Sequence, residues 1–248
     1  MSEKKLFCVD LGASGGKCFV GTFKKSGDFT MDEVHRFDHG GTSFYLADRS
    51  GAVSERSYWD DTAIYDNIIK GLHAYRRERG SSVDAIGIDT WGADGAFMSA
   101  DGEMLGKVHT YRDHRLDAMC AEVIAKLGEK QIYSITGVHF QPFNVSNQLL
   151  WFVTRRPELL KLAERFLPVP TLFNFYLSGA TAVDSSWASV TQLMDAATHE
   201  WSETIMSALG VPERVMPQIV EPGTIIGKLR PELAEAIGIS RADVVAGG

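Results

Sequence analysis

The feature that most limits the folds open to this chain is a short apolar run that ends in an acidic residue and a cluster of glycines. Leu6–Val9 is apolar, Asp10 follows, and residues 11–17 read Leu-Gly-Ala-Ser-Gly-Gly-Lys. An apolar run bounded by glycine predicts a buried strand that enters a tight turn. Strand character resumes at 18–23, and residues 29–37 alternate between apolar and polar. We therefore expect a three-stranded meander whose first turn has the size of a phosphate group.

The residues after this meander predict a helix followed by a strand, so that a strand of the meander, the helix and the new strand occur in that order. Residues 60–79 carry apolar side chains at helical spacing, which predicts an amphipathic helix, and 83–89 is the next apolar run. This order suggests a parallel pair in a covered sheet. Residues 38–57 are rich in Gly, Ser and Asp, and we expect a long functional or mobile loop there.

Beyond Gly106 the pattern changes to that of helices. They are expected over residues 113–127, 130–136, 144–155, 157–165, 171–177 and 201–209. No repeat and no linker rich in Pro or Ser divides the sequence. We therefore predict one α/β domain, residues 6–248, with a helical insertion.

Composition narrows the function classes. The net charge of −7 gives no basic footprint for nucleic acid and argues against binding to an anionic membrane. The first apolar run is too short for a signal peptide, and none approaches the roughly 20 residues of a membrane span. The three cysteines form no C-x-x-C pair, as expected for thiols in a reducing compartment. We expect a soluble cytoplasmic protein without nucleic-acid or membrane partners.

The glycine-rich turn is the first candidate site. Its candidate phosphate-binding residues are Asp10, Gly12, Ala13, Ser14, Gly15, Gly16 and Lys17. Glycines permit a tight turn whose N–H groups face an anion, Lys17 adds a positive charge, and Asp10 could hold a metal ion, directly or through water. The loop is not a Walker motif. An ordinary glycine-rich hairpin turn is an equally open interpretation.

The second candidate site follows the strand at 83–89. Asp89 and Asp94 flank a Trp-Gly turn, in which Gly92 permits close approach of a ligand. Trp91 could cover the apolar face of a sugar, and Asp94 could accept hydrogen bonds from its hydroxyls. Alternatively, Asp89 caps a turn and Trp91 belongs to the core.

Two further segments carry polar groups suited to sugars. Arg112 presents a fork of donors that Asp113 could orient, although Asp113 could also simply cap a helix. In the loop at 136–144, Gln141 and Asn144 alternate with aromatic residues, which suits a polyol. Asn144 is also a candidate N-cap of the following helix.

Taken together, these segments resemble the N-terminal domain of the FGGY carbohydrate kinases, and within that family the rhamnulokinases. The matching stretches are V-D-L-G-A-S-G-G-K at 9–17, H-R-F at 35–37, I-G-I-D-T-W-G-A-D at 86–94, Y-R-D-H-R at 111–115, I-Y-S-I-T-G-V at 132–138, Q-P-F-N at 141–144, T-Q-L at 191–193 and P-G-T-I-I-G at 222–227. Their common order over residues 6–248 is more specific than any single motif.

The resemblance implies an actin-like, ribonuclease-H-like fold with a mixed sheet, and ATP and sugar bound between two such domains. It implies that residues 13–17 contact ATP phosphates and that Asp10 lies near Mg²⁺. The sugar contacts that it implies are Gly92, Asp94, Arg112, Asp113, Gln141 and Asn144, to which the Trp-Gly turn adds Trp91 as a candidate from its residue type. Three features depart from the family pattern: Lys17 replaces an arginine, residues 94–97 are less hydrophobic, and the 38–57 loop is long.

The activity implied is phosphorylation of a ketose such as L-rhamnulose at its C1 hydroxyl. L-fuculose, xylulose or a related ketose, a non-catalytic sugar-binding fragment, and another actin-fold ATPase are the alternatives.

The resemblance also bears on the catalytic base, which in this family is an aspartate that follows a strand and a few small residues. Residues 243–248 read as such a strand and its small residues, ending at Gly248. We therefore expect the base to follow Gly248, so that no catalytic residue lies within the chain. We further expect an ATP-binding domain outside these residues and negligible kinase activity of this chain alone, and a homodimer is a further option.

Overall fold

The computed structural model describes residues 3–48 and 50–247. A six-stranded mixed sheet lies at its centre, in the order β11-β12-β6-β1-β2-β3. The strands are β1 (Lys4–Leu11), β2 (Gly15–Phe23), β3 (Phe29–Asp38), β6 (Ala85–Thr90), β11 (Ile225–Lys228) and β12 (Asp243–Val245). The predicted antiparallel meander β1-β2-β3 is confirmed, and β6 and β12 run parallel to β1, so the α/β class with a mixed sheet is confirmed.

The strand expected near residue 243 is β12, which pairs parallel with β6 and thereby joins the central sheet. Val244 and Ala246 are buried there. Gly248, after which we expect the catalytic base, lies outside the described residues. The position of that base therefore stays a prediction.

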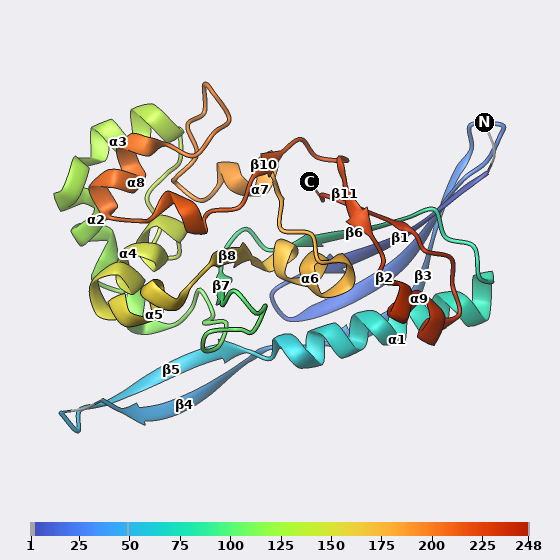
Figure 1. Cartoon of the computed structure of the whole chain (residues 1–248), viewed down its shortest axis with the longest axis horizontal. Coiled ribbons are helices and arrows are strands. Elements are labelled where there is room, and N and C mark those ends of the chain that lie inside the picture. The colour runs from blue at the N-terminus through green and yellow to red at the C-terminus, as the bar shows by residue number, and fades with distance from the viewer. Residues whose placement is uncertain (1–2, 49, 248) are drawn as a thin grey trace.

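The long helix α1 (Asp61–Arg79) runs along the sheet and confirms the predicted amphipathic helix (Figure 1). Asp60 caps its N-terminus, where the carboxylate accepts a hydrogen bond from Ala63 N at 2.9 Å. Ile64, Ile68 and Leu72 lie on one face and are fully buried against the sheet. The short helix α9 (Pro231–Ile237) contacts α1.

A second group of elements forms the helical insertion (Figure 1). Its helices are η1 (His114–Leu116), α2 (Met119–Leu127), α3 (Glu129–Thr136), α4 (Val145–Arg155), α5 (Pro157–Leu162), α8 (Glu203–Leu209) and η2 (Glu213–Val215). They enclose a hydrophobic core of their own, distinct from the core beneath the sheet. The chain thus builds two adjacent cores.

Short elements connect the two cores. They are β7 (Gly95–Met98), which pairs with β8 (Arg165–Pro168), the helices α6 (Val169–Ser178) and α7 (Ser185–Ser189), and the pair β9 (Val183–Asp184) and β10 (Ile219–Val220). The prediction of one helix over 157–165 was wrong at its end. Residues 165–168 are extended because they pair with β7 in the buried interior.

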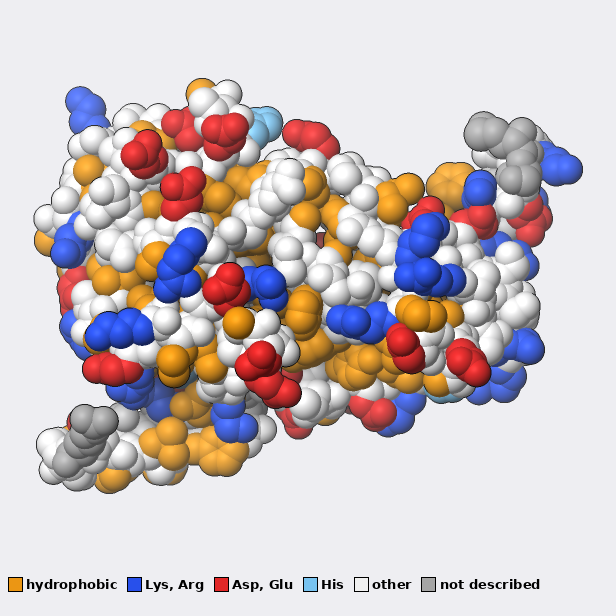
Figure 2. Space-filling model, in the orientation of Figure 1, with side chains coloured by type: hydrophobic (Ala, Val, Ile, Leu, Met, Phe, Trp, Pro, Cys, Tyr) orange, Lys and Arg blue, Asp and Glu red, His pale blue; other side chains and the backbone are white. Residues whose placement is uncertain are grey.

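The expected loop at 38–57 is instead a β-hairpin, so that prediction was wrong. Strands β4 (Gly41–Ala47) and β5 (Val53–Trp59) pair antiparallel and project from the body (Figure 1). All of β4 is exposed, so no alternation of buried and exposed side chains marks it in the sequence. Phe44 and Tyr45 are among its exposed apolar residues. Hydrophobic side chains gather on the surface of the projecting hairpin in Figure 2.

The expected helix over 113–127 is also interrupted. The Asp113 carboxylate accepts a hydrogen bond from Arg115 N at 2.8 Å and caps the single turn η1. Helix α2 then begins at Met119. The other predicted helices agree with the structure to within two residues, apart from the end at 157–165.

Candidate functional site

Two of the candidate motifs, the glycine-rich turn and the Trp-Gly turn, meet where β1 and β6 end. These strands are parallel neighbours, and Asp10 pairs in register with Asp89. Carboxyl ends of parallel strands meet at one edge of a sheet, so the glycine-rich turn and the Trp-Gly turn lie side by side. The structure thus brings together two motifs that are 79 positions apart in sequence.

The glycine-rich turn joins β1 to β2 and closes with a hydrogen bond from Gly12 N to Gly15 O at 2.9 Å. None of Gly12, Gly15 and Gly16 has a positive φ, so the turn does not need glycine for a left-handed backbone. Glycine is needed here because a larger residue would not fit. A Cβ on Gly16 would overlap the Phe37 ring and lie 2.9 Å from Leu11 Cδ2. Glycine at these positions leaves room for Phe37 of the neighbouring strand β3, which pairs with Gly16.

The charged groups of this turn are accessible. Lys17 Nζ lies 4.0 Å from Asp10 Oδ2, and their side chains are 39% and 53% exposed. Contact at that distance leaves both groups free to meet a ligand. Ser14 is exposed at the tip, and its carbonyl accepts a hydrogen bond from His39 N at 3.2 Å.

Asp89 and Asp184 add negative charge beside Asp10. Burial raises the pKa of Asp89, and the nearby carboxylates of Asp10 and Asp184 raise it further. Asp184 is buried and caps α7, where it accepts a hydrogen bond from Trp187 N at 2.8 Å. A cavity of about 150 Å³ opens between these groups. It is lined by Ile88, Asp89, Thr90, Gly92, Pro170, Asp184, Ser186, Trp187, Val190 and Gly247.

Asp94 occupies a different place from the one expected for a sugar ligand. Its side chain is fully buried, and four donors surround the carboxylate. Oδ2 accepts hydrogen bonds from Trp59 Nε1 at 2.7 Å, Trp91 Nε1 at 3.1 Å and Tyr111 N at 3.0 Å, and Oδ1 accepts one from Gln148 Nε2 at 3.0 Å. We refer to Asp94 and these four donors as the Asp94 network.

The Asp94 network ties four segments together. Trp59 ends β5, Trp91 lies in the turn after β6, Tyr111 precedes η1, and Gln148 lies on α4. Burial raises the pKa of Asp94 to about 6, against the opposing effect of these hydrogen bonds and of Arg115. Asp94 also has a positive φ of 72°, which is unusual for a residue other than glycine. The carboxylate therefore organises the turn that presents Gly92.

An aromatic wall runs from this network to the glycine-rich turn. The Trp59 and Trp91 rings lie 4.4 Å apart, and the His39 ring lies 5.7 Å from each. Burial lowers the pKa of His39. Both of its ring nitrogens are buried and have no hydrogen-bond partner within residues 3–48 and 50–247. His39 links the glycine-rich turn to the second motif, a role that its spacing did not indicate.

Arg112 and Asp113 are neighbours in sequence but differ in solvent exposure. The Arg112 guanidinium lies 4.9 Å from the centre of the Tyr111 ring, and the residue is exposed. Asp113 is buried and accepts hydrogen bonds from Ser57 N at 2.6 Å and Arg115 N at 2.8 Å. The structure thus leaves Arg112 accessible and gives Asp113 its predicted capping contact.

The loop before α4 likewise contains one accessible and one buried candidate residue. Gln141 is exposed, whereas Asn144 is buried and its Oδ1 accepts a hydrogen bond from Gln141 N at 2.6 Å. Asn144 stands at the N-cap position of α4 but its side chain reaches back into the loop instead of capping the helix. Gln148 Nε2 also donates to Phe143 O at 3.0 Å, so this loop is fixed to the Asp94 network.

Sequence reasoning missed Trp59 and Gln148, which complete this network. A signal for Gln148 exists, because Ser146, Asn147 and Gln148 interrupt an otherwise apolar helix and are all buried. Buried polar side chains need partners, so such a run indicates an interior hydrogen-bond network. Trp59 carries no comparable signal.

The described residues were also compared with the requirements of a metal site and of a membrane-spanning helix. Within residues 3–48 and 50–247, no group of three or more His, Cys, Asp or Glu side chains could hold a metal ion by itself. Mg²⁺ commonly keeps several water ligands and takes one or two carboxylates together with substrate phosphates, so the accessible carboxylate of Asp10 is compatible with such an ion. No helix in the described part of the chain is long and apolar enough to cross a membrane.

Comparison with known proteins identifies the family. The profile described as "FGGY family of carbohydrate kinases, N-terminal domain" matches residues 48–248. The chain therefore belongs to the FGGY family of carbohydrate kinases, as its motifs predicted.

Relatives of known name agree with this family. The chain is 34% identical to a rhamnulokinase of Pectobacterium carotovorum over 92% of its own length and 44% of the relative. It is 33% identical to a rhamnulokinase of Oceanobacillus iheyensis over 93% of its length and 47% of the relative. The chain thus spans less than half the length of these relatives.

Solved structures of sugar kinases share the fold. Gluconate kinase from Lactobacillus acidophilus superposes with a TM-score of 0.83 at 18% identity, covering 100% of this chain and 48% of that one. Xylulose kinase from the same organism gives 0.82 at 18%, covering 99% of this chain and 48% of that one. The actin-like, ribonuclease-H-like fold expected from the sequence is confirmed.

Proposed function

We propose that this chain forms the sugar-binding side and the phosphate loop of an ATP-dependent kinase that phosphorylates a ketose such as L-rhamnulose at C1. The cavity between Asp89 and Gly92, beside the glycine-rich turn, carries the proposal. In it, a small polar substrate would lie next to the groups suited to phosphate. The rhamnulokinase relatives support L-rhamnulose over other ketoses.

The phosphate side would be formed by residues 10–17. Backbone N–H groups of the turn and Lys17 would bind the phosphates of ATP, since both favour a concentrated negative charge. Asp10 would hold Mg²⁺, which offsets charge on the transferring phosphoryl group. The accessible Lys17 and Asp10 side chains support these roles.

The sugar side would combine accessible groups with a buried support. Gly92, Gln141 and Arg112 are exposed and would contact the sugar directly, while Trp91 would cover an apolar face. Asp94, Asp113 and Asn144 are buried and would hold these groups in position. Sugar recognition would thus rest on residues whose own orientation is fixed by hydrogen bonds.

We propose that the full reaction needs residues outside these 248, among them a catalytic base after Gly248, because the relatives are about twice as long as the chain. ADP release from ATP, Mg²⁺ and L-rhamnulose should stay well below about 1 s⁻¹, the lower end for kinases, with the 248-residue chain. The same assay on a protein that contains both halves should show turnover. Turnover by the short chain would contradict this part of the proposal.

The assignment of the cavity is tested on the longer protein with Asp89→Asn. We expect a large loss of kcat/KM for the ketose, because the substitution removes a carboxylate from the cavity wall. Asp101→Asn, at an exposed turn, is the matched control and should behave as the unsubstituted protein. L-fuculose and D-xylulose, assayed in parallel, decide the substrate. Equal kinetics of the two variants would refute the cavity as the sugar site.

A further inference from the structure

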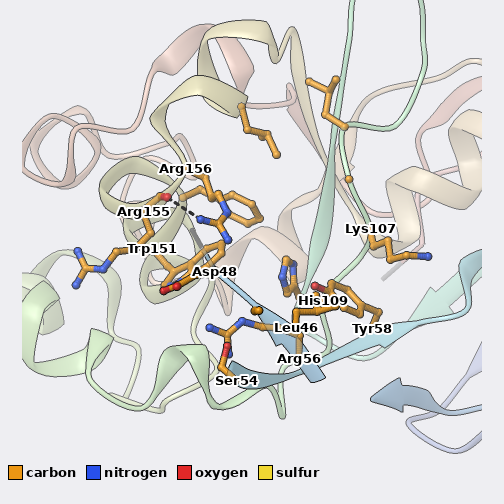
Figure 3. Close-up of a pocket in the computed structure, with 15 residues that line it drawn as sticks. Leu46, Asp48, Ser54, Arg56, Tyr58, Lys107, His109, Trp151, Arg155 and Arg156 are labelled. Carbon is orange, nitrogen blue, oxygen red and sulfur yellow. Dashed lines mark hydrogen bonds between the residues drawn. The ribbon is translucent and has the colours of Figure 1, made fainter. Parts of the chain in front are cut away.

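A second cavity, of about 460 Å³, lies between the β4–β5 hairpin and helices α4 and α5 (Figure 3). This volume is within the range of small-molecule sites. Its lining residues are Leu46, Ala47, Asp48, Ser54, Arg56, Tyr58, Leu105, Gly106, Lys107, His109, Trp151, Phe152, Arg155, Arg156 and Leu159. None of the residues proposed for ATP or sugar is among them.

Three segments of the chain line this cavity: the β4–β5 hairpin, residues 105–109 and residues 151–159. Ser54, Arg56 and Tyr58 alternate along β5, so they share one face of the strand. Trp59 is on the opposite face and belongs to the Asp94 network. The cavity is thus separated from the Asp94 network by the thickness of one strand.

Positive charge dominates the cavity. Four of the lining residues are Arg or Lys and one, Asp48, is acidic, although the whole chain carries a net charge of −7. The Asp48 carboxylate is engaged in its own turn, accepting hydrogen bonds from Ser50 N at 2.8 Å and Ala52 N at 3.1 Å. Hydrogen bonds from the Ser50 hydroxyl and from backbone N–H groups lower the pKa of this carboxyl, so Asp48 stays ionised and offsets one of the four positive charges, and the lining residues keep an excess of positive charge.

The arginines differ in how they are placed. Arg155 points away from the cavity in Figure 3 and pairs with Glu122 at 2.7 Å. Arg56 and Arg156 extend from opposite walls (Figure 3). Arg56 Nη1 is 4.0 Å from a carboxylate oxygen of Asp113. Arg156 Nη1 donates a hydrogen bond to the Arg155 carbonyl oxygen at 3.2 Å, and within residues 3–48 and 50–247 the Arg156 guanidinium makes no ion pair.

His109 lies in the same wall as these cations. Its ring lies 4.7 Å from that of Tyr58 and 5.5 Å from that of Trp151. Burial, together with the charges of Arg115, Arg56 and Arg156, lowers the pKa of His109 to about 2. The imidazole is therefore neutral, and it adds an uncharged polar ring to a cationic wall.

We propose that this cavity binds a small phosphate monoester, with Arg56 and Arg156 on the phosphate and Trp151 and Tyr58 against its organic part. Guanidinium forks match phosphate oxygens in pairs, which a point charge cannot do. The Arg156 guanidinium already lies 5.2 Å from the centre of the Trp151 ring, so its orientation is partly fixed. The proposal does not depend on the proposed kinase function.

Calorimetric titration of the 248-residue chain with phenyl phosphate and with inorganic phosphate tests the proposal. Phenyl phosphate should bind with one-to-one stoichiometry and more tightly than inorganic phosphate, because only the monoester also meets the aromatic wall. Benzenesulfonate and benzoate at matched ionic strength should bind more weakly. Absence of saturable binding of phenyl phosphate would overturn the proposal.

Variants locate the binding. Arg156→Gln should weaken phenyl phosphate binding by about tenfold or more, and Arg156→Lys should weaken it less because it keeps the charge and loses the fork. Arg77→Gln, on the exposed face of α1, makes the same change far from the cavity and should have no effect. Lys17→Ala separates this site from the glycine-rich turn and should also leave binding intact.

Two outcomes would refute the location. One is equal affinity of Arg156→Gln and Arg77→Gln. The other is loss of binding in Lys17→Ala with Arg156→Gln unaffected, which would assign the phosphate to the glycine-rich turn. Circular dichroism of each variant shows whether it is folded, and Trp151→Phe gives a second, independent probe of the same wall.

Discussion

Replacing Asp94 by asparagine tests whether the Asp94 network is an ionised carboxylate held among donors. Asparagine keeps the shape and one oxygen but exchanges the other for an NH₂ group. In the least disruptive orientation the oxygen keeps the three donors of Oδ2, and the NH₂ group then faces Gln148 Nε2, 3.0 Å from the present Oδ1. Two donors would then oppose each other in a buried site.

Two effects of similar size oppose each other at pH 7. Loss of a hydrogen bond to a buried charged group costs about 1.5–3 kcal/mol. Against this, the variant no longer buries a charge. The carboxyl pKa rises from 3.8 to about 6 in the folded chain, which corresponds to a penalty of about 3 kcal/mol for the ionised form. The free energy of unfolding should therefore change by no more than about 1–2 kcal/mol at pH 7.

The pH dependence separates the two effects. Because the folded pKa is raised, the carboxyl contributes stability that is fully present below pH 3.8 and is lost as the pH rises through about 6. Between pH 7 and 4.5 the unsubstituted chain should gain about 2 kcal/mol relative to Asp94→Asn. His109 titrates with the opposite sign, but it is present in both proteins and cancels in the difference.

Urea unfolding at pH 7 and pH 4.5, followed by circular dichroism, measures this difference. A stability difference between the two proteins that does not change with pH would show that Asp94 has an ordinary pKa in the folded chain. The reasoning about its buried charge would then be wrong. Asp101→Asn, at an exposed turn, is the control for the same change of side chain outside the Asp94 network.

Three further substitutions test other parts of the structure. Gly16→Ala should destabilise the chain by about 1–3 kcal/mol in urea unfolding, since the new Cβ overlaps the Phe37 ring, whereas Gly40→Ala meets open space and should be nearly neutral. His109→Phe should remove a loss of about 2 kcal/mol between pH 7 and 5, because the folded pKa of His109 is lowered to about 2 and its stability contribution falls as the pH drops below 6.5; parallel pH profiles of the two proteins would contradict this. Lys17→Ala should raise the KM for ATP of the longer kinase by about tenfold while leaving the ketose KM unchanged, and an unaltered ATP KM would remove Lys17 from the phosphate site.

The sequence predicted those parts of the fold that repeat a local pattern. Helix α1 has an apolar stripe and a capping Asp60, and both are visible in sequence. Strands β7 and β8 are four residues each and almost entirely buried, so periodicity could not distinguish them from helix. The β4–β5 hairpin lacked any buried face from which β4 could be recognised.

The candidate site could be located but not assembled from sequence. Local residue patterns identified the glycine-rich turn and the Trp-Gly turn. The family resemblance predicted that the two turns belong to one site. The partners of Asp94 are 35 positions away at Trp59 and 54 at Gln148, a separation at which spacing carries no information. Exposure is equally invisible in sequence, which is why Asp94 and Gln141 were given the same role although one is buried and the other open.

The two hydrophobic cores have a consequence for how the candidate site would be lost. Trp59 belongs to the core beneath the sheet, while Gln148 lies on α4, whose apolar face fills the core of the helical insertion. Separate cores open as separate cooperative units. Partial unfolding of the insertion alone would withdraw Gln148 from Asp94 and release the Trp-Gly turn, while β1, β2 and the glycine-rich turn stayed folded. Mild denaturing conditions would thus disrupt the proposed sugar site before the proposed phosphate site.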